Sequence, residues 1–184
     1  MSDKIIEILE RARWAPSGDN CQPWKFEILS DYNLRIHVSN DIDNVYETSP
    51  KKPSWIAAGA LVENIRLVAA TKNMLLKISK VTEADGGGGC IDIVFMDESV
   101  EYDPLEKYIE TRTVCRTAFK TTDLPDDIIN DLKKAVGSEF TLRWHTGMSG
   151  RLKMLRVNAL ASNIRLMIKE TFEIHKSIID WNNC

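Results

Sequence analysis

A long apolar stretch in the middle of the chain constrains the fold most strongly. From Trp55 to about Lys72, apolar residues recur at the spacing of a helix, and Ser54 precedes them as a candidate N-cap. Segment 57–60 reads Ala-Ala-Gly-Ala, whose small side chains allow another backbone to approach closely. Glycine inside a helix costs roughly 1 kcal/mol relative to alanine, so close helix packing is the default explanation. We therefore expect a central, buried helix here.

The remaining pattern mixes helices and strands without a regular βαβ repeat. Helices are predicted at Asp3 to about Arg13, Pro104 to about Thr111, Pro125 to Val136 and about Ser149 to beyond Phe172, and strands at Trp24–Leu29, Leu34–Val38, Leu75–Val81, Ile91–Phe95 and Phe140–Trp144. The first two strands flank a short polar turn and are expected to form a β-hairpin, which the polar segment 40–53 follows. This mixture predicts an α+β protein with a mixed or antiparallel sheet packed with helices.

Four consecutive glycines, at 86–89, separate the third and fourth predicted strands. Such a run can cradle a phosphate, but a phosphate loop also needs a following helix that begins with Lys-Ser or Lys-Thr, and the sequence has none at this place. A flexible hairpin tip is therefore predicted.

Composition excludes several classes of protein. The chain has 184 residues, with 24 Lys and Arg against 27 Asp and Glu, so its formal net charge is −3. This size predicts one domain or a pair of small lobes, and a hydrophobic fraction of 43% with a charged fraction of 28% excludes disorder, collagen and coiled coil. Without a basic block, nucleic acid and anionic membranes are not expected partners. No apolar run reaches the roughly 18 residues of a membrane span and Met1–Lys4 lack a signal-peptide layout, so a cytoplasmic protein is expected.

The spacing of cysteines and histidines predicts no metal site. These residues lie far apart, without a C-x-x-C pair, and we expect reduced thiols. They are Cys21, Cys90, Cys115, Cys184, His37, His145 and His175. Cys115 lies between two arginines, whose positive charges would lower the pKa of its thiol, but the commoner role of a buried structural cysteine is expected for it.

The first candidate site is the loop 15–24, which reads Ala-Pro-Ser-Gly-Asp-Asn-Cys-Gln-Pro-Trp and connects a predicted helix to a predicted strand. Its candidate residues are Ser17, Asn20, Gln22, Pro23 and Trp24. The first three offer hydrogen-bond donors and acceptors, the proline stiffens the exit, and the tryptophan offers a flat apolar surface, so the loop suits a flat heteroaromatic ligand with amide-like edges. The alternative is that Ser17 and Asn20 satisfy the backbone of a turn and that Trp24 belongs to the core.

The second candidate site is segment 112–116, which reads Arg-Thr-Val-Cys-Arg. The guanidinium groups of Arg112 and Arg116 flank a threonine hydroxyl and suit a monophosphate, because the planar fork of arginine donates two parallel hydrogen bonds. The alternative is a solvated face on which Glu106 and Glu110 pair with the arginines.

These segments resemble the nitroreductase family. Segment 15–24 is similar to the FMN-contacting signature of the family, segment 57–64 (Ala-Ala-Gly-Ala-Leu-Val-Glu-Asn) resembles its buried central helix, and segment 112–116 resembles its Arg-x-Ser/Thr-x-x-Arg-type phosphate-binding element. The resemblance implies a nitroreductase-like α+β fold, commonly a homodimer, with the FMN sites at the interface between two modules.

The resemblance also implies which residues contact the cofactor. Those expected at the isoalloxazine ring or the ribityl chain are Ser17, Asn20 and Gln22, with Pro23 and Trp24 shaping the loop, and those expected at the phosphate are Arg112, Thr113 and Arg116. Family members pass a hydride from NAD(P)H to the flavin and then electrons to a nitroaromatic, a quinone or a similar acceptor, while the protein supplies orientation and electrostatics. The sequence names no catalytic acid or base.

The order of the motifs resembles one subgroup of the family. In common short nitroreductases the arginine element precedes the Gln-Pro-Trp loop, whereas here it follows about ninety residues later. That order resembles a subgroup in which two modules are fused in a longer chain, of which this chain matches the front module. We expect residues 1–184 to form a single nitroreductase-like domain, either a truncated product or a half-sized relative, whose flavin pocket a second copy completes. The alternatives are a flavin-sequestering protein without turnover and a degenerate module that acts in assembly.

Overall fold

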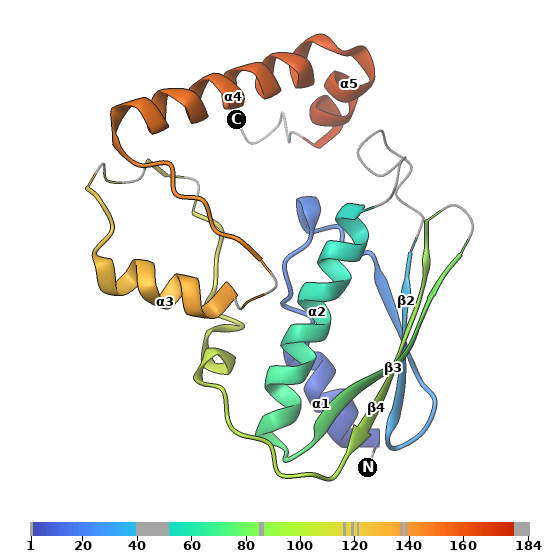
Figure 1. Cartoon of the computed structure of the whole chain (residues 1–184). Coiled ribbons are helices and arrows are strands. Elements are labelled where there is room, and N and C mark those ends of the chain that lie inside the picture. The colour runs from blue at the N-terminus through green and yellow to red at the C-terminus, as the bar shows by residue number, and fades with distance from the viewer. Residues whose placement is uncertain are drawn as a thin grey trace. The chain divides into compact units, whose positions relative to one another are not determined.

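The chain divides into two compact units, Met1–Thr113 and Val114–Cys184. The structure is a computed structural model, which describes residues 2–39, 52–84, 87–115, 117–118, 120, 122–136, 138 and 140–178 (Figure 1). The expectation of one domain over the whole chain stays a prediction.

The first unit is built on a four-stranded antiparallel sheet (Figure 1). Its strands are β1 (Trp24–Ile28), β2 (Asn33–Val38), β3 (Leu75–Glu83) and β4 (Gly89–Met96), in the order β1-β2-β4-β3. The pairing of β1 with β2, with Trp24 opposite Val38, confirms the predicted hairpin. An antiparallel sheet with separate helices confirms the α+β class.

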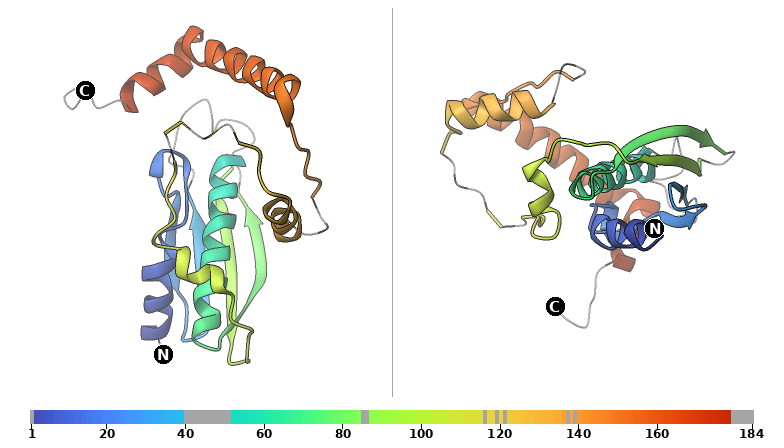
Figure 2. Two further views of the ribbon diagram at one scale, coloured as in Figure 1. Left: turned by 90° about the vertical axis from the view of Figure 1, so that its left-hand side faces the viewer. Right: turned by 90° about the horizontal axis from the view of Figure 1, so that it is seen from below.

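Two helices cover one face of this sheet (Figures 1 and 2). Helix α1 (Ser2–Ala12) lies beside α2 (Lys52–Thr71), and α2 packs on β2 and β3. Alternate residues of the strands point toward the helices and form the core together with the apolar stripe of each helix. The largest fully buried side chains are Phe95, Ile5, Ile8, Leu34, Ile36, Leu61, Ile65, Met74, Ile93 and Val68.

Helix α2 differs from its prediction at its start and on one side. It begins at Lys52, so Ser54 is not the cap but lies buried in the first turn. Ala57 and Ala58 are buried, as close packing requires, whereas a Cβ added at Gly59 would meet no described atom within 4 Å. The side chain of Ile56 is 72% exposed. In the part of the chain that the structure describes, this helix is therefore buried on one face.

The loop between β3 and β4 is the predicted hairpin tip, although Gly86 lies outside the described residues. The indole N–H of Trp55, in the first turns of α2, donates to the carbonyl of Gly87 across 3.0 Å. A Cβ at Gly89 would lie 2.1 Å from the carbonyl oxygen of Thr82 and 2.9 Å from the Trp55 ring. Glycine at 89 is therefore required by the close approach of backbone and indole.

The other face of the sheet carries polar side chains on its inner strands. Arg35 of β2 lies opposite Asp92 of β4 and donates to both of its carboxylate oxygens, across 2.7 and 3.1 Å. These hydrogen bonds, with the positive charge of Arg35, hold the pKa of Asp92 below its usual range against the effect of desolvation. Strand β3 forms an edge, and a register shift between Ile78 and Lys80 interrupts its pairing with β4.

Beyond the sheet, the first unit ends with a short 3-10 helix, η2 (Pro104–Tyr108), in place of the longer helix predicted to Thr111. The carboxylate of Asp103 caps it by accepting from the backbone N–H of Leu105 across 3.0 Å.

The second unit contains α3 (Asp126–Val136), α4 (Gly147–Met167) and α5 (Lys169–Ile178). Helix α3 confirms the prediction within one residue.

The strand predicted at Phe140–Trp144 is wrong, because these residues are irregular and pair with no strand among the described residues. The single long helix predicted from Ser149 is also wrong, since Ile168 has extended backbone angles and separates α4 from α5. The hydroxyl of Thr171 donates to the Arg165 carbonyl across 2.7 Å, which satisfies an acceptor freed by the break.

No helix among the described residues is long and apolar enough to cross a membrane.

Replacing Gly89 by alanine is expected to destabilise the protein by about 1–3 kcal/mol, because the added methyl group would press on the backbone of the hairpin. Gly59→Ala is the matched control: the new methyl group meets no described atom there, and alanine favours a helix over glycine by roughly 1 kcal/mol, so stability should rise. Urea unfolding followed by circular dichroism measures both. Equal stability of Gly89→Ala and the wild type would contradict the close approach.

The Arg35–Asp92 pair predicts a pH dependence with a definite sign. Because the folded state lowers the carboxyl pKa, the pair contributes stability above the ordinary pKa of an aspartate, and this contribution is lost as pH falls through the lowered value. The difference in unfolding free energy between the wild type and Arg35→Gln should therefore be largest near neutral pH and shrink as the pH falls below the ordinary pKa of an aspartate. Urea unfolding of both proteins across this range measures the difference. A gap that stays constant would show that the pair does not stabilise the fold.

Candidate functional site

The loop 15–24 is held by hydrogen bonds within itself. The hydroxyl of Ser17 accepts from the backbone N–H of Gln22 across 3.0 Å, and the backbone N–H of Cys21 donates to the Gly18 carbonyl across 2.9 Å. The side-chain amide of Gln22 donates to that of Asn20 across 3.3 Å. The Ser17 hydroxyl thus satisfies the turn backbone, as the alternative interpretation proposes for it.

Three residues of this loop have left-handed backbone angles. The φ angles are 48° for Asp19, 56° for Asn20 and 48° for Gln22. Asp and Asn tolerate this region because their short side chains bond locally, but a glutamine rarely occupies it. Such strain costs of order 1–3 kcal/mol per residue and is found where a surrounding structure holds a side chain in place.

The η2 segment is fixed by both helices of the first unit. Arg11 of α1 forms ion pairs with Glu106 and with Glu110, the latter across 3.1 Å. From α2, Arg66 donates to Asp103, the cap of η2, across 3.2 Å. The hydrogen bonds that Arg66 donates to the carboxylates of Glu63 and Asp103 raise the pKa of its guanidinium, against the effect of its partial burial.

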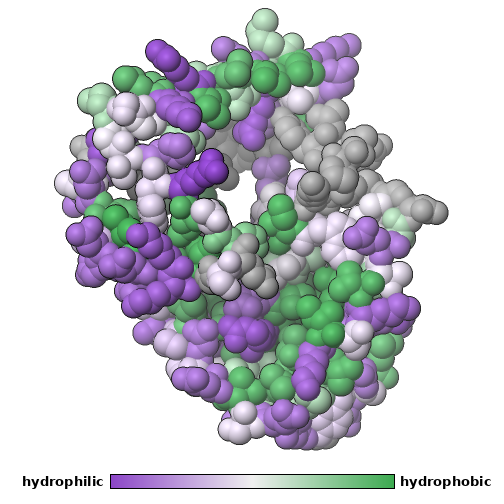
Figure 3. Space-filling view, viewed as in Figure 1, coloured by the Kyte–Doolittle hydropathy of each residue, from purple (hydrophilic) through white to green (hydrophobic). Residues whose placement is uncertain are grey.

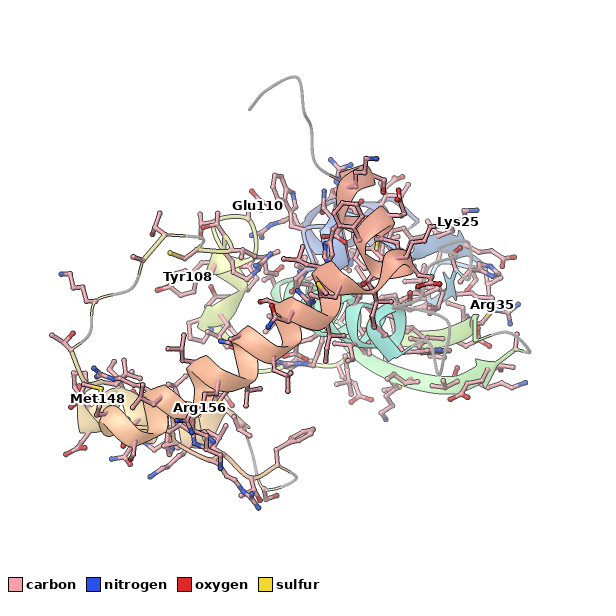
Figure 4. All side chains as sticks on the ribbon, turned by 90° about the horizontal axis from the view of Figure 1, so that it is seen from above. Lys25, Arg35, Tyr108, Glu110, Met148 and Arg156 are labelled. Carbon is pink, nitrogen blue, oxygen red and sulfur yellow. The ribbon has the colours of Figure 1, made fainter. Side chains whose placement is uncertain are left out.

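These contacts correct one expectation about segment 112–116. Glu106 and Glu110 pair with Arg11 rather than with Arg112. The backbone N–H of Arg112 donates to the Tyr108 carbonyl across 2.8 Å, which fixes the residue directly after η2. Its guanidinium forms no ion pair with the described residues. Tyr108 and Glu110 mark this part of the chain in Figure 4.

One cavity of about 420 Å3 brings the two candidate sites together. It is lined by Arg13, Trp14, Ala15, Pro16, Asn20, Gln22 and Arg112. Residues from the end of α1, from the loop and from the segment after η2 thus share one cavity, although ninety positions separate Gln22 from Arg112 in the sequence. Its volume falls in the range of roughly 300–1,000 Å3 that is usual for small-molecule sites.

The remaining predicted residues lie elsewhere. Pro23 and Trp24 are buried, and Trp24 belongs to the hydrophobic core, as the alternative interpretation holds. Ser17 and Thr113 do not line the cavity. Arg116 lies outside the described residues.

Four lining residues are not among the predicted site residues: Arg13 and Trp14, and also Ala15 and Pro16 of the loop motif. Trp14 is 53% exposed, so it is this indole rather than that of Trp24 that offers a flat apolar face. Arg13 adds a second guanidinium and pairs with Glu10 across 3.2 Å. The sequence could have indicated Arg13 and Trp14 as site residues, because they follow the last apolar position of the α1 stripe and directly precede the Ala15-Pro16 motif.

The charge of the cavity favours an anion. Arg13 and Arg112 contribute two guanidinium groups, and the lining residues that the structure describes include no carboxylate. The amides of Asn20 and Gln22 add donors and acceptors at the same site. Among the described residues of the lining no side chain titrates near neutral pH, so these residues supply binding groups and no acid or base.

A second cavity, of about 440 Å3, differs in its electrostatics. It is lined by Lys4, Lys72, Asn73, Asp97, Glu98 and Ser99, so charges of both signs face it. Lys72 already bonds Glu7, which lowers the pKa of that carboxyl, and Asp97 accepts the hydroxyl of Tyr32, which raises the pKa of the phenol. Lys72 and Asp97 thus already have partners outside the lining, unlike Arg112.

Cys115 differs from its expectation as a buried structural residue. It is exposed, and hydrogen bonds with Thr117 lower the pKa of its thiol.

Comparison with known proteins adds little to this geometry. No family model and no curated protein matches the chain. Among solved structures, a nitroreductase-like family protein from Bacillus cereus aligns with a TM-score of 0.42 and 13% identity, over 64% of this chain and 86% of that one. This likeness is too distant to show what the cavity binds. We therefore infer its ligand from the residues that line the cavity.

Proposed function

We propose that the cavity beside the loop 15–24 binds FMN and that the protein is an FMN-dependent oxidoreductase of the nitroreductase type. One observation carries the proposal: Asn20, Gln22 and Arg112, assigned to opposite ends of one cofactor by resemblance, line a single cavity. Two guanidinium groups, a half-exposed indole and two amides fit a ligand that combines a phosphate with a flat heteroaromatic ring.

Different residues of the cavity would bind the phosphate and the ring of FMN. Arg112 and Arg13 would hold the phosphate by charge-assisted hydrogen bonds, with Thr113 and Arg116 following in the same segment. Asn20 and Gln22 would bond the polar edge of the ring or the ribityl chain, and the strained backbone at Gln22 would keep that amide in place before the ligand arrives.

Bound FMN would supply the redox chemistry, which transfers a hydride taken from NAD(P)H to a nitroaromatic, a quinone or a similar acceptor. The chain itself would orient the ring and offset the charge of the phosphate. Because no lining residue is an acid or base near neutral pH, the described residues would not donate protons to the acceptor.

We further propose that the protein forms a homodimer. The support is the amount of apolar surface on α4, where apolar and charged side chains alternate along the helix (Figures 3 and 4). Its exposed apolar residues are Met148, Leu152, Met154, Leu155, Val157, Leu160, Ile164, Leu166 and Met167. In the fused subgroup that the motif order resembles, a second module would cover the first. A second copy of this chain would take that place.

Arg112→Ala is expected to weaken FMN binding by about 1.5–3 kcal/mol, roughly 10- to 150-fold, because a hydrogen bond to a charged phosphate is lost. Arg116→Ala should have an effect in the same range. Quenching of flavin fluorescence on titration measures the affinity. Lys77→Ala, which removes one positive charge from an exposed position on β3, is the matched control and should bind like the wild type. Unchanged affinity in both arginine variants would remove this segment from the site.

Turnover separates the proposal from its alternatives. The flavin-loaded protein should oxidise NADH or NADPH with a nitroaromatic acceptor, and the rate should fall in Arg112→Ala in proportion to flavin occupancy. Bound flavin without turnover would establish the sequestering alternative. A protein that stays colourless after incubation with FMN would establish the degenerate module.

The homodimer predicts a mass in solution of twice 20.9 kDa. Leu155→Arg and Leu160→Arg place a charge on exposed positions of α4, so each should shift the mass toward one chain while leaving thermal unfolding of the monomer nearly unchanged. Light scattering coupled to size-exclusion chromatography measures the mass. A wild-type protein that elutes as one chain at micromolar concentration would overturn the dimer.

A further inference from the structure

Three chemically reactive side chains meet on the face of the sheet opposite α1 and α2. The sulfur of Cys90 lies 3.4 Å from Nδ1 of His37, and Nε2 of the same ring lies 2.7 Å from a carboxylate oxygen of Glu27. They come from the neighbouring strands β4, β2 and β1, and Cys90 is the direct pairing partner of His37.

The sheet itself fixes this cluster. Residues on either side of Cys90 and His37 in their strands, such as Ile91 and Ile36, are buried against the helices. Because side chains alternate across a strand, Cys90 and His37 point to the opposite face. His37 and Glu27 are about half exposed, so small molecules in solution can reach the cluster.

Each contact has a chemical consequence. When Glu27 accepts the Nε2 proton of the neutral ring, Nδ1 carries a lone pair and can accept the thiol proton of Cys90. The carboxylate also stabilises the imidazolium that forms. This is the arrangement of a nucleophile, a base and a group that orients the base.

Other charged groups on the same face surround the cluster. Arg35 lies two residues from His37 on β2, and Lys25 of β1 is the direct pairing partner of His37. On β4, Asp92 is the next outward residue after Cys90. Lys80 of β3 lies opposite Asp92. Arg35 and Asp92 bond each other. Thr82 is the β3 partner of Cys90 and carries no charge.

We propose that Cys90 is a modification site that undergoes exchange with low-molecular-weight disulfides, with His37 as its base and Glu27 as a positioning residue. This site is independent of the flavin cavity, because none of its residues lines that cavity. It lies on the sheet face opposite α1 and α2, and neither described cavity includes it, so a small disulfide rather than an enclosed substrate fits the described surroundings.

The reaction balances with the disulfide as the oxidant. The Cys90 thiol gives its proton to Nδ1 of His37, and the thiolate attacks one sulfur of the disulfide. The bond between the two small-molecule sulfurs breaks and a bond from Cys90 to one of them forms. The other sulfur leaves as a thiolate and takes the proton from His37. Cys90 is thereby oxidised to a mixed disulfide, and one small thiol is released.

The test uses glutathione disulfide as the probe and intact mass with peptide mapping as the readout. In the full-length protein, Cys90 should acquire glutathione at least about tenfold faster than Cys21, because a positioned base accelerates proton transfer. His37→Gln should slow the reaction of Cys90 at pH 7 at least about tenfold. A variant that keeps Cys90 as its single thiol, with serine at positions 21, 115 and 184, should react at the wild-type rate of Cys90.

Glu27→Gln tests the positioning role through the pH profile. It should move the pH at which the Cys90 rate reaches half of its plateau upward, while the far-ultraviolet circular dichroism stays unchanged. Asp92→Asn is the matched control: it also removes a carboxylate from the same face, but one that hydrogen-bonds Arg35 rather than His37, so it should leave the profile nearer to the wild type. Reaction of Cys90 no faster than Cys21, or an unchanged rate in His37→Gln, would overturn the proposal.

Discussion

The ion pairs of Arg11 with Glu106 and Glu110 hold the first unit's candidate site in place. Glu106 is 6% exposed, and a carboxylate so buried is costly unless a cation stabilises it. By supplying that cation, α1 binds the segment around η2, and Arg66 binds the same segment from α2. Arg112 follows directly after this fixed turn, so its position beside the loop 15–24 is a consequence of two helix contacts made elsewhere. Without them the cavity would lose one of its walls.

Periodicity predicted most of the fold of the first unit. The helix at 2–12, the hairpin after it and the second pair of strands all follow from alternation or helical spacing of apolar residues. These patterns hold because the helices and strands bury one face between the helix layer and the sheet. The strand expected at Phe140–Trp144 failed because alternation alone does not provide a pairing partner. The long helix failed at Ile168, where no glycine or proline marks the break that the Thr171 hydroxyl satisfies.

The candidate site was predicted less completely than the fold. Asn20, Gln22 and Arg112 were named from their motifs, and they line one cavity. The two tryptophans of this region could not be assigned from composition, since the choice between Trp14 and Trp24 depends on which side of the chain faces the core. The cluster of Glu27, His37 and Cys90 depends on strand register, which brings together residues that share no local motif.

The shape of the edge strand β3 limits how copies of this protein can associate. An exposed edge strand offers unpaired backbone groups to which another chain can add as a further strand. Here the register shift between Ile78 and Lys80 breaks the regular row of those groups, and Lys77 and Lys80 place positive charges beside it. Edge-to-edge extension of the sheet at β3, the usual start of fibre formation, is thereby disfavoured, which leaves the β1 edge and the helical surfaces as routes to ordered assembly.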